Sequence, residues 1–309
     1  MNALTMVGIG GLGCPALMGI LSGWPVDREL RIRLIDPDVI QLSNLNRQIL
    51  FSETDLGSAK TIVAATRARE LFDCKHVSFE PIQEALNETN IQRLLADSQC
   101  VIDGTDSART KLLLNDFCVK QRLPLVYGGA TGYEGVSLLV RPGGACLRCV
   151  FGEFLSEEIA ELEGGCRAQG IVGAVVGMVG LQQAESALKL LLQPGDCLEP
   201  AQLYRFSLKG ARSKTSPVLP TADCPNGCAA VRSDRKRLDL THLHCPETFL
   251  YTKLTLEKLP RNTELEILFN NQLSAKNVCQ SIVEEGQLVL EECRVLGDDR
   301  YQTTIAKVI

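Results

Sequence analysis

The sequence predicts an α/β protein with a doubly wound, mainly parallel sheet, followed by a smaller two-layer α/β unit. Three observations lead to this fold class. Short apolar segments alternate with longer amphipathic ones along the first part of the chain, as strands and helices do around a parallel sheet. The first apolar segment, residues 4–7, breaks at glycine into a helical pattern. From residue 213 Ser, Thr, Pro, Asn and Gly dominate, which indicates a break between two units.

Composition bounds the classes of function. The 309 residues are 45% hydrophobic and 22% charged, which is ordinary for a globular protein large enough for two domains. A formal net charge of −5 argues against a nucleic-acid partner. The longest apolar stretch, residues 171–181, is too short to span a bilayer, so we expect no membrane partner. Thirteen cysteines without a secretory signal predict a reducing, cytoplasmic compartment rather than a disulfide framework.

The first strand leads into a glycine-rich turn, Gly8-Ile9-Gly10-Gly11-Leu12-Gly13. Gly8 permits a tight turn, Gly10 lets the main chain approach a phosphate, and Gly13 lets the following helix pack close to the strand. The N-terminus of that helix directs free amide N–H groups at the anion. The pattern predicts a nucleotide site in a Rossmann-like sheet. The alternative is a glycine turn that exists for steric reasons alone.

A second strand, residues 30–36, ends in an acid. Asp36 stands at about the distance expected for a ribose-binding carboxylate, so we interpret it as the nucleotide anchor. A nicotinamide enzyme would show the same glycines and the same acid. The segment after Asp36 discriminates between the two, because it carries the polar residues Asn44, Asn46, Arg47 and Gln48, which a dehydrogenase does not need.

The alternation of strands and helices continues beyond this segment. We expect helices at residues 56–72, 84–96, 112–121 and 171–192, and strands at residues 77–79, 100–103, 125–127 and 135–141, the last of them antiparallel. Ligands of a doubly wound sheet lie at the carboxyl ends of its strands. Asp36 and Asp106 both occupy such ends.

The second unit follows a candidate linker. We place the first domain at residues 1–212, the linker at 213–235 and the second domain at 236–309. The charge run at residues 232–237 is interpreted as a solvated hinge rather than an interaction patch. Beyond the linker we expect, in order, a strand at 238–240, a helix at 246–259, a strand at 264–269, a helix at 274–285, and strands at 287–292 and 301–306.

Two cysteine pairs have the spacing of metal ligands, Cys146-Leu-Arg-Cys149 and Cys224-Pro-Asn-Gly-Cys228. Four thiolates can form a closed tetrahedral zinc site, and a closed site is structural because no coordination position is left open. The alternative is that all four are ordinary buried thiols.

The segments Gly8 to Pro15 and Asp36 to Gln48, together with Lys60, Asp106, the two cysteine pairs and Cys166, resemble the family of MoeB, ThiF and HesA. These proteins are relatives of the ubiquitin-activating enzymes and adenylate the C-terminal glycine of ubiquitin-like proteins. The resemblance therefore implies ATP and Mg²⁺ at the glycine turn, with zinc at the cysteines. In the second pair this family commonly has two intervening residues rather than three.

The resemblance also assigns roles. It makes Arg47 and Lys60 phosphate clamps and places Asp106 on the Mg²⁺, whereas the family usually has Asn at Ser107 and Arg at Lys111. Without it, Arg47 could form a salt bridge on a helix surface, and Asp106 could be a helix N-cap. The implied nucleotide-binding residues are Gly8, Gly10, Gly11, Gly13, Asp36, Asn44, Arg47, Gln48, Lys60 and Asp106.

Cys166 lies in Gly164-Gly-Cys-Arg-Ala-Gln-Gly170, a glycine-flanked loop before the long apolar helix. Such a loop suits a reachable thiol, so Cys166 is a candidate nucleophile. In the relatives a cysteine at this place receives sulfur or the acyl group. The alternative is a buried thiol.

The segment from Leu238 to Pro246 resembles the TusA family of persulfide-carrying sulfur-transfer proteins. Pro246 suits the first turn of a helix, which places Cys245 at a helix N-terminus, where the dipole favours thiolate or persulfide. The family commonly has Gly at His242 and a second Pro at Thr248, and these departures concern partner recognition. The alternative is a Cys-Pro pair that merely starts a helix.

The sequence thus predicts a fusion of an adenylating domain with a sulfur carrier, in which Cys245 or Cys166 delivers sulfur to an activated glycine carboxylate to form a thiocarboxylate. The expected partners are a β-grasp, ubiquitin-like carrier, a persulfide donor such as a cysteine desulfurase or rhodanese, and a second copy in a homodimer. The alternative functions are a catalytically impaired scaffold that binds nucleotide and carrier, and an NAD-dependent dehydrogenase. Relatives have an arginine-bearing helix before the first strand, where this sequence has three residues before Leu4. A truncated start, a charge supplied from elsewhere and an impaired activity would each account for that.

Overall fold

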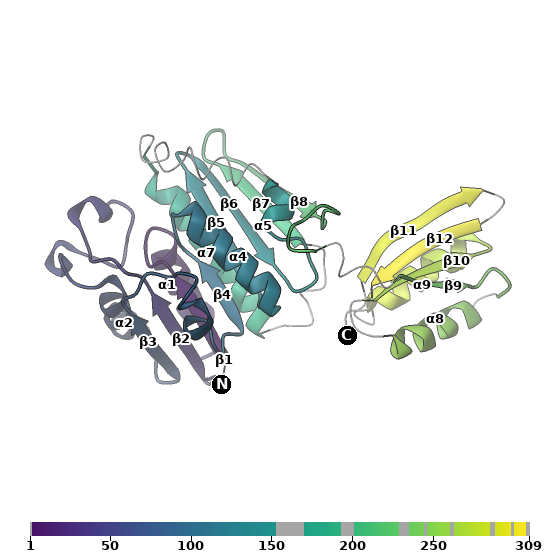
Figure 1. Ribbon diagram of the computed structural model, residues 1–309, viewed down its shortest axis with the longest axis horizontal. Helices are drawn as coiled ribbons and strands as arrows, with labels where there is room; N and C mark the ends of the chain where they lie inside the picture. Colours follow the sequence, from purple (N-terminus) through teal and green to yellow (C-terminus); the bar gives the residue numbers. More distant parts are fainter. Residues whose placement is uncertain are drawn as a thin grey trace. The chain divides into compact units, whose positions relative to one another are not determined.

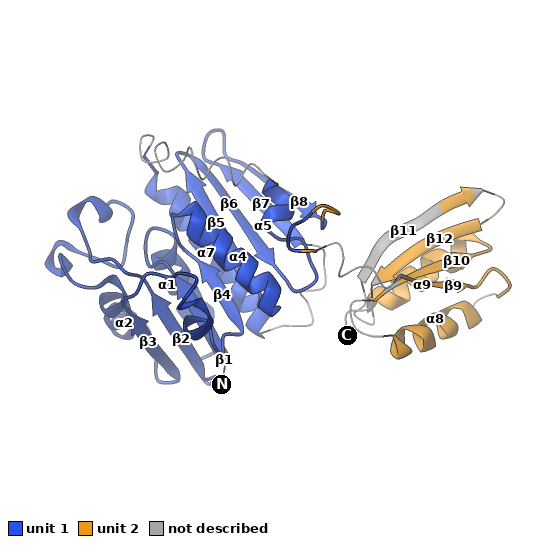
Figure 2. Cartoon of the chain, in the orientation of Figure 1, with its two compact units in different colours: residues 1–194, 200–220, 224–226 blue, residues 195–199, 221–223, 227–309 orange. Residues whose placement is uncertain are grey.

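The structure is a computed structural model that describes residues 2–152, 170–192, 201–228, 235–243, 246–259, 263–284, 288–297 and 300–306. The chain forms two compact units, coloured separately in Figure 2. The first comprises residues 1–194, 200–220 and 224–226, and the second comprises residues 195–199, 221–223 and 227–309.

The first unit is built on an eight-stranded sheet with the order β3-β2-β1-β4-β5-β6-β7-β8 (Figure 1). Five strands run parallel: β1 (Asn2–Val7), β2 (Leu30–Ile35), β3 (Val77–Ile82), β4 (Cys100–Asp103) and β5 (Leu125–Thr131). Three more extend the sheet in antiparallel fashion: β6 (Glu134–Val140), β7 (Ala201–Ser207) and β8 (Arg212–Val218). Strand β1 lies between β2 and β4, and the strand order runs in opposite directions on its two sides. This is the switch point of a doubly wound sheet. The predicted fold class is confirmed.

Helices and short 3₁₀ turns connect these strands. The helices are α1 (Gly13–Gly23), α2 (Lys60–Leu71), α3 (Ile91–Leu94), α4 (Ala108–Gln121), α5 (Leu147–Phe151) and α7 (Gly173–Leu192), and the 3₁₀ turns are η1 (Leu42–Asn44) and η2 (Glu53–Asp55). Helix α1 packs closely on α7, because a Cβ atom on Gly19 would stand only 2.6 Å from the Cβ of Ala184. No described helix is long and apolar enough to cross a bilayer.

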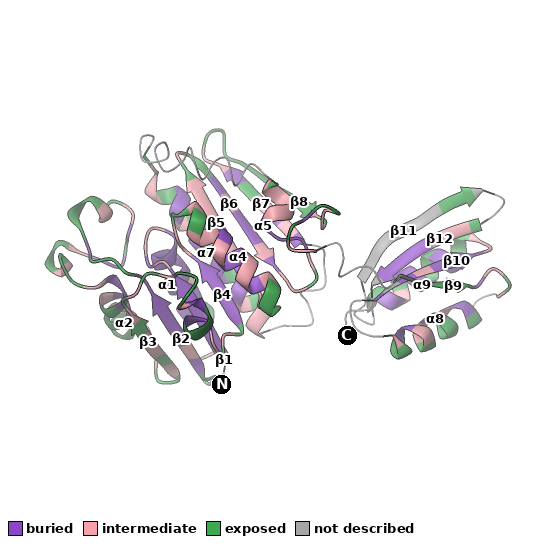
Figure 3. Cartoon of the chain, viewed as in Figure 1, coloured by how far each residue is buried: buried purple, intermediate pink, exposed green. Residues whose placement is uncertain are grey.

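The central strands are buried on both faces, which explains their continuous apolar runs. Met6 of β1, Leu34 of β2 and Ile102 of β4 are inaccessible to solvent, and the strands carrying them are mostly buried (Figure 3). A strand covered on both faces shows no alternation of polar and apolar residues, so it is recognised by its length and composition. The core therefore fixes the strand ends from which the site is built.

The helix expected at residues 84–96 is wrong over most of its length, since only Ile91–Leu94 is helical. Asn87 explains the difference. Its Oδ1 atom accepts hydrogen bonds from the backbone N–H groups of Thr89, at 2.9 Å, and Asn90, at 3.2 Å. The Asn90 Oδ1 in turn accepts from the Asn87 N–H at 2.8 Å. These local bonds satisfy the backbone outside a helix and so compete with one.

Strands β7 and β8 were not predicted, and β8 occupies the start of the expected linker. Residues 212–218 pair antiparallel with β7, so the segment from 213 to 218 belongs to the first sheet and is no linker. The Ser and Pro residues of this segment suggested a linker, but they are also compatible with an edge strand such as β8. A proline such as Pro217 is tolerated at an edge, where one row of backbone groups faces solvent.

The second unit contains a four-stranded sheet with the order β11-β12-β10-β9. Its elements are β9 (Arg235–Asp239), α8 (Glu247–Lys258), β10 (Glu264–Phe269), α9 (Gln272–Glu284), β11 (Leu288–Gly297) and β12 (Arg300–Ala306). Strand β9 runs parallel to β10, and the other pairs are antiparallel. The buried residues Leu265, Ile267, Phe269, Val278 and Ile282 form its core. The predicted βαβαββ order is confirmed.

Candidate nucleotide site and cysteine cluster

Three glycines bring the ends of β1 and β4 against the start of α1. Gly8 has a φ of +88°, and a Cβ atom there would lie 2.6 Å from the carbonyl carbon of Gly104. Cβ atoms on Gly13 or Gly104 would collide with the Gly8 carbonyl oxygen. We call Gly8, Gly13 and Gly104 the glycine cradle. Backbone packs directly on backbone here, which no other residue type permits.

The N-terminus of α1 opens onto this cradle without a side-chain cap. Leu12 occupies the N-cap position and supplies no capping oxygen. The Cys14 N–H already donates to the Gly10 carbonyl oxygen at 3.0 Å and Pro15 has no N–H, so an anion here would meet the amides of the glycine turn that leads into the helix. A Cβ atom on Gly10 would meet the Gln48 Nε2 atom at 3.5 Å as its nearest neighbour, which leaves room in front of the helix. The geometry fits a phosphate at this position.

Asp36 directly follows β2 and holds the glycine turn. Its Oδ2 atom accepts a hydrogen bond from the Ile9 N–H at 2.6 Å, and its Oδ1 accepts from the Asp38 N–H at 2.9 Å. The side chain is buried, and this burial raises the pKa of its carboxyl, although Lys60 and the two N–H donors oppose the change. Asp36 thus orders the turn itself, and ribose binding by the same carboxylate stays a prediction.

Lys60 is the first residue of α2 and lies beside this acid. Its Nζ atom is 2.7 Å from Asp38 Oδ2 and 3.9 Å from Asp36 Oδ1, and the residue is only 5% exposed. One ammonium thus faces two carboxylates, the buried one of Asp36 and the exposed one of Asp38. These two ion pairs fix the position of the Lys60 Nζ atom. Lys60 thus lies beside the acid that follows β2, and its phosphate-binding role stays a prediction.

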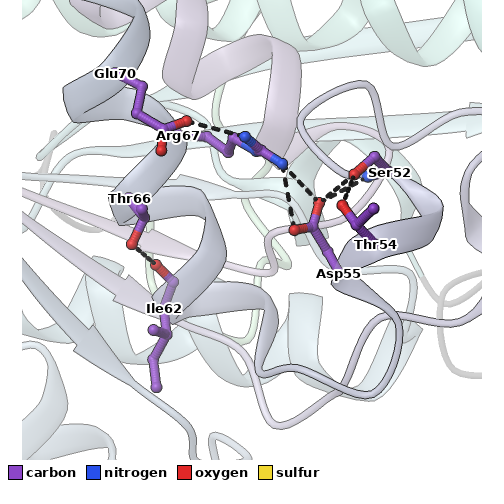
Figure 4. Close-up of polar contacts among 7 residues, drawn as sticks. All are labelled: Ser52, Thr54, Asp55, Ile62, Thr66, Arg67 and Glu70. Atoms are coloured by element: carbon purple, nitrogen blue, oxygen red, sulfur yellow. Dashed lines mark hydrogen bonds and ion pairs between the residues drawn. The ribbon is translucent and has the colours of Figure 1, made fainter.

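A polar network ties the turn before α2 to the body of that helix (Figure 4). Asp55 Oδ2 accepts hydrogen bonds from the Ser52 N–H and hydroxyl, and Arg67 Nη2 lies 3.3 Å from each Asp55 oxygen. Arg67 Nη1 also donates to Glu70 at 3.0 Å. Burial opposes ionisation of Asp55, but the hydrogen bonds from Ser52 and Arg67 hold the pKa of its carboxyl below the usual value. The network fixes where α2 begins, and therefore where Lys60 stands.

The remaining residues of the polar segment differ in their burial and in their hydrogen bonds. Gln48 is 3% exposed, and its Oε1 atom accepts no hydrogen bond from the part of the chain that the structure describes. Arg47 is half-buried, and its Nη1 donates to the Ser43 carbonyl at 2.9 Å and to Asn46 Oδ1 at 3.0 Å. Asn44 closes η1, where its Oδ1 accepts from the Gln41 N–H at 3.3 Å. A buried amide oxygen without a hydrogen-bond partner is uncommon in a folded protein, so Gln48 stays a candidate nucleotide-binding residue.

Asp106 follows β4 in a short exposed loop. The helix N-cap is Ser107, whose hydroxyl oxygen accepts from the Thr110 N–H at 3.3 Å, so the N-cap interpretation of Asp106 is wrong. The Asp106 carboxylate follows β4, the strand beside β1, whose end carries the glycine turn. An exposed carboxylate at that place fits a cation-binding role, and Mg²⁺ at Asp106 stays a prediction.

Asp103 and Lys111 form a buried ion pair that was not predicted from the sequence. Asp103 is inaccessible to solvent, and Lys111 Nζ lies 3.0 Å from its Oδ2 and 2.6 Å from the Gly128 carbonyl oxygen. Asp103 Oδ1 accepts from the N–H and the hydroxyl of Thr105. The pair therefore anchors the loop from Gly104 to Ser107. The signal was present in the acid that ends β4 and the lysine eight positions later.

The four paired cysteines come together. The sulfur atoms of Cys146, Cys149, Cys224 and Cys228 all lie within 4.8 Å of one another. Cys146 Sγ is 3.9 Å from Cys149 Sγ and 3.6 Å from Cys224 Sγ. Tetrahedral zinc with Zn–S bonds of about 2.3 Å places its sulfurs about 3.8 Å apart. We call these four residues the cysteine cluster, and its donor set and spacing fit zinc.

Two other predicted cysteines lie outside the described residues. These are Cys166 and Cys245, the candidate nucleophile and the candidate sulfur carrier. By contrast, Cys14 of α1 and Cys118 of α4 are buried in the first unit. Burial raises the pKa of each of these two thiols to about 12, so both stay protonated at neutral pH.

Comparisons with known proteins agree with this architecture. Residues 3–226 match the family model described as ThiF family. Residues 236–307 match the family model described as Sulfurtransferase TusA. The two matches cover the eight-stranded sheet and the four-stranded sheet respectively.

Individual relatives are similar over different lengths. The chain is 34% identical over 72% of its length to the SAMP-activating enzyme E1 of Haloferax volcanii, and covers 79% of that protein. It is 30% identical over 95% of its length to the adenylyltransferase and sulfurtransferase MOCS3 of Aedes aegypti, and covers 65% of it. It covers 41% of the MOCS3 of Anopheles gambiae, so the chain spans about half of the MOCS3 relatives it matches. The crystal structure of E. coli MccB with ATP has the same fold over 72% of this chain, with a TM-score of 0.60 and 20% identity.

Proposed function

The chain belongs to the ThiF family, and from that premise we propose that it is an ATP-dependent adenylyltransferase and sulfurtransferase. Its substrate is the C-terminal glycine of a ubiquitin-like sulfur-carrier protein, which it converts to a thiocarboxylate. The observation that carries the proposal is the glycine cradle with the uncapped start of α1, joined in one chain to a segment that matches TusA. The Aedes relative is named for the same two activities, and the Haloferax relative is named as an activating enzyme.

Adenylation joins a carboxylate to the α-phosphate of ATP. A carboxylate oxygen of the glycine attacks the α-phosphorus, the bond to the bridging oxygen breaks, and pyrophosphate leaves. The amides of the glycine turn at the start of α1 receive phosphate oxygens, and the Gln48 side chain beside Gly10 contacts the nucleotide. Arg47 and Lys60 neutralise negative charge on the phosphates. For Lys60 this requires a shift of its ammonium from Asp38, which the exposed Asp38 side chain allows.

Asp106 is the residue that we assign to Mg²⁺. When bound, the ion would neutralise phosphate charge and orient the triphosphate. The Asp103–Lys111 pair anchors the loop from Gly104 to Ser107 and therefore helps to position the Asp106 carboxylate. Asp36 binds the ribose hydroxyls in the same proposal, while it continues to hold the Ile9 N–H.

Sulfur transfer follows on the activated carboxyl. The terminal sulfur of a Cys245 persulfide attacks the carbonyl carbon and displaces AMP, which gives an acyl disulfide. A thiolate then attacks the Cys245 sulfur, the S–S bond breaks, and the carrier leaves as a thiocarboxylate while the attacking thiol and Cys245 become a disulfide. An external dithiol supplies that thiol and reduces the resulting disulfide, and a persulfide donor such as a cysteine desulfurase or rhodanese then reloads Cys245. In the alternative route Cys166 receives the sulfur before the activated carboxyl does. We also propose a homodimer that works in the cytoplasm.

The decisive test is pyrophosphate exchange. We expect the protein to catalyse exchange between ATP and labelled pyrophosphate only when a recombinant ubiquitin-like carrier ending in glycine is present. Asp106→Ala should abolish this exchange. Asp27→Ala, which removes an exposed acid between α1 and β2 that has no predicted role, should leave it unchanged. Binding of ATP and carrier without exchange in the unaltered protein would instead establish a scaffold.

The sulfur step is tested separately. Cys245→Ser should keep pyrophosphate release and lose thiocarboxylate formation from a persulfide donor. Replacing carboxylate oxygen by sulfur adds about 16 Da to the carrier, so intact mass is the readout. A normal yield from Cys245→Ser would show that Cys245 is not the obligatory sulfur donor. The sulfur would then come from Cys166 or from external sulfide.

A further inference from the structure

The second cysteine pair contains one residue more than the usual spacing of its family, and Asn226 stands in the middle of that loop. Its Nδ2 atom donates to Asp116 Oδ1 at 2.8 Å and lies 3.6 Å from Cys146 Sγ. Asn226 therefore contacts a sulfur of the first pair and a carboxylate of α4 at the same time. Both partners lie far away in the sequence.

Gly227 makes this arrangement possible. Its φ of +64° is in the left-handed region, which glycine adopts without steric cost. The chain can thus turn directly after Asn226 and still deliver Cys228 to the cluster. The extra residue in the loop places a side-chain amide beside the sulfurs while leaving both cysteines as potential ligands.

Asp116 collects donors from both cysteine segments. Arg148, which lies between Cys146 and Cys149, donates to its Oδ1 through Nε at 2.8 Å and to its Oδ2 through Nη2 at 2.6 Å. Burial would raise the pKa of the Asp116 carboxyl, but the hydrogen bonds from Arg148, Asn226 and Asn115 outweigh it and hold the pKa low. The carboxylate therefore stays ionised and can orient every donor around it.

Asn115 completes the connection to the first pair. It is inaccessible to solvent, its Nδ2 donates to Asp116 Oδ1 at 3.0 Å, and its Oδ1 accepts from the Leu147 N–H at 2.9 Å. Leu147 directly follows Cys146, so this bond fixes the backbone of a cluster residue. We call Asn115, Asp116, Arg148 and Asn226 the Asp116 network.

Charge explains what the network could do for a metal. Zinc with four thiolates carries a net charge of −2, which is costly in a buried site. The Asn226 amide lies 3.6 Å from Cys146 Sγ, and the Arg148 guanidinium belongs to a residue between Cys146 and Cys149, so both donors stand next to the cluster. Donors next to metal-bound thiolates offset their charge, and residues around metal ligands commonly control affinity in this way.

We propose that the Asp116 network positions the cysteine cluster for zinc. The additional residue in the second pair allows Asn226 to reach both Asp116 and Cys146. The inference rests on zinc occupancy of the cluster and is independent of adenylation. Asn226 and Arg148 are positioning residues, since they act through the sulfurs and through Asp116.

The test measures metal retention rather than enzyme activity. Zinc release to an excess of chelator should be about 10-fold faster or more in Asn226→Ala than in the unaltered protein. Asn226→Gln retains the amide and should recover part of the difference. Pro225→Ala is the matched control, because it alters an exposed position of the same loop and Pro225 has no side-chain hydrogen bond to lose, so its release rate should be unchanged.

Cobalt substitution separates positioning from general loosening. Loss of the hydrogen bond to Cys146 should shift the thiolate-to-cobalt charge-transfer band in Asn226→Ala and leave it in place in Pro225→Ala. Equal release rates and identical bands in the two variants would overturn the role of Asn226. Failure of the unaltered protein to bind either zinc or cobalt would overturn the inference at its premise, without bearing on pyrophosphate exchange.

Discussion

The glycine cradle and the cysteine cluster each hold several chain segments together at one point, but they do so by opposite means. The cradle removes side chains so that backbone can touch backbone, and its centre is a run of six residues joined by one glycine after β4. The cluster uses side chains only, and its two pairs are separated by 78 residues between Cys146 and Cys224. Both sites follow from local motifs, the glycine run and the two cysteine pairs, whereas the side chains that hold them, such as Lys111 on Asp103 and Asn226 on Asp116, could not be predicted because they join distant segments.

The two regions also use cysteine differently. Cys14 belongs to the helix that starts at the cradle, and it is fully buried and protonated. The cluster cysteines face one another at distances that suit a metal. The surroundings of a thiol, rather than its identity, decide whether it acts as a small apolar residue or as a ligand.

Metal removal should have the largest effect on this comparison, because it acts on the cluster alone. We expect about one zinc per chain and a clear drop in thermal stability on chelation or in Cys149→Ala, since structural zinc contributes directly to folding, by about 10–16 kcal/mol of apparent binding energy in zinc-finger peptides. Cys74→Ala is the control, because that half-buried cysteine lies outside the cluster. Metal analysis and thermal unfolding would measure both, and a metal-free protein of full stability would contradict the expectation.

Lys111→Met should have the next largest effect, and it acts on the support of the cradle. The substitution leaves the Asp103 carboxylate buried without its cation, and breaking such a pair costs about 3–5 kcal/mol of unfolding free energy. Lys111→Arg keeps the charge and should lose less. Urea unfolding measures the difference. If Lys111→Met and Lys111→Arg were equally stable, the ion pair would not be what anchors the loop.

Gly13→Ala and Gly10→Ala should separate packing from binding within the cradle region. A Cβ on Gly13 collides with the Gly8 carbonyl, so we expect a loss of about 1–3 kcal/mol of unfolding free energy or more. A Cβ on Gly10 finds ordinary contact distances, and Gly10→Ala should be neutral or stabilising by up to about 1 kcal/mol.

The same Gly10→Ala protein should bind ATP more weakly, because the added methyl group enters the space in front of α1. Calorimetric titration with ATP, paired with urea unfolding, would measure both properties. Unchanged ATP affinity in a stable Gly10→Ala protein would show that the phosphate does not approach this residue.

The smallest expected effect is the absence of reaction at Cys14 and Cys118. Their pKa of about 12 leaves almost no thiolate at pH 7.5, so alkylation of the folded protein should spare both, as peptide mass mapping would show. After chelation the cluster cysteines should label, and these two should not. Labelling of Cys14 in the folded protein would contradict its burial.

The same raised pKa has a consequence for stability at high pH. The folded state holds the proton more tightly than the unfolded chain, whose thiol ionises near 9.0. The contribution to stability is therefore full below pH 9.0 and is lost as pH rises toward about 12. Urea unfolding at pH 8 and pH 10 would detect the decrease.

Much of the fold could be predicted because the relevant signals are local. The buried strands of the first sheet, the glycine turn and the βαβαββ order of the second unit all follow from short apolar runs, glycines and helical periodicity. The failures were local patterns with a competing explanation. Asn87 replaced a helix by side-chain hydrogen bonds, and the Ser- and Pro-containing β8 forms because it pairs with β7, its place at the sheet edge making Pro217 tolerable.

Local sequence patterns specify the type of each site: a glycine turn followed by an acid, a lysine at a helix start, and two pairs of thiols. The partners that these groups meet depend on how the sheet and helices pack. This packing buried Lys60 between Asp36 and Asp38, set Lys111 under the loop of Asp106, and aimed Asn226 at Cys146. The physical reason is that backbone conformation responds to neighbouring residues, whereas ion pairs and ligand sets join positions that only the packed sheet brings within a few ångströms.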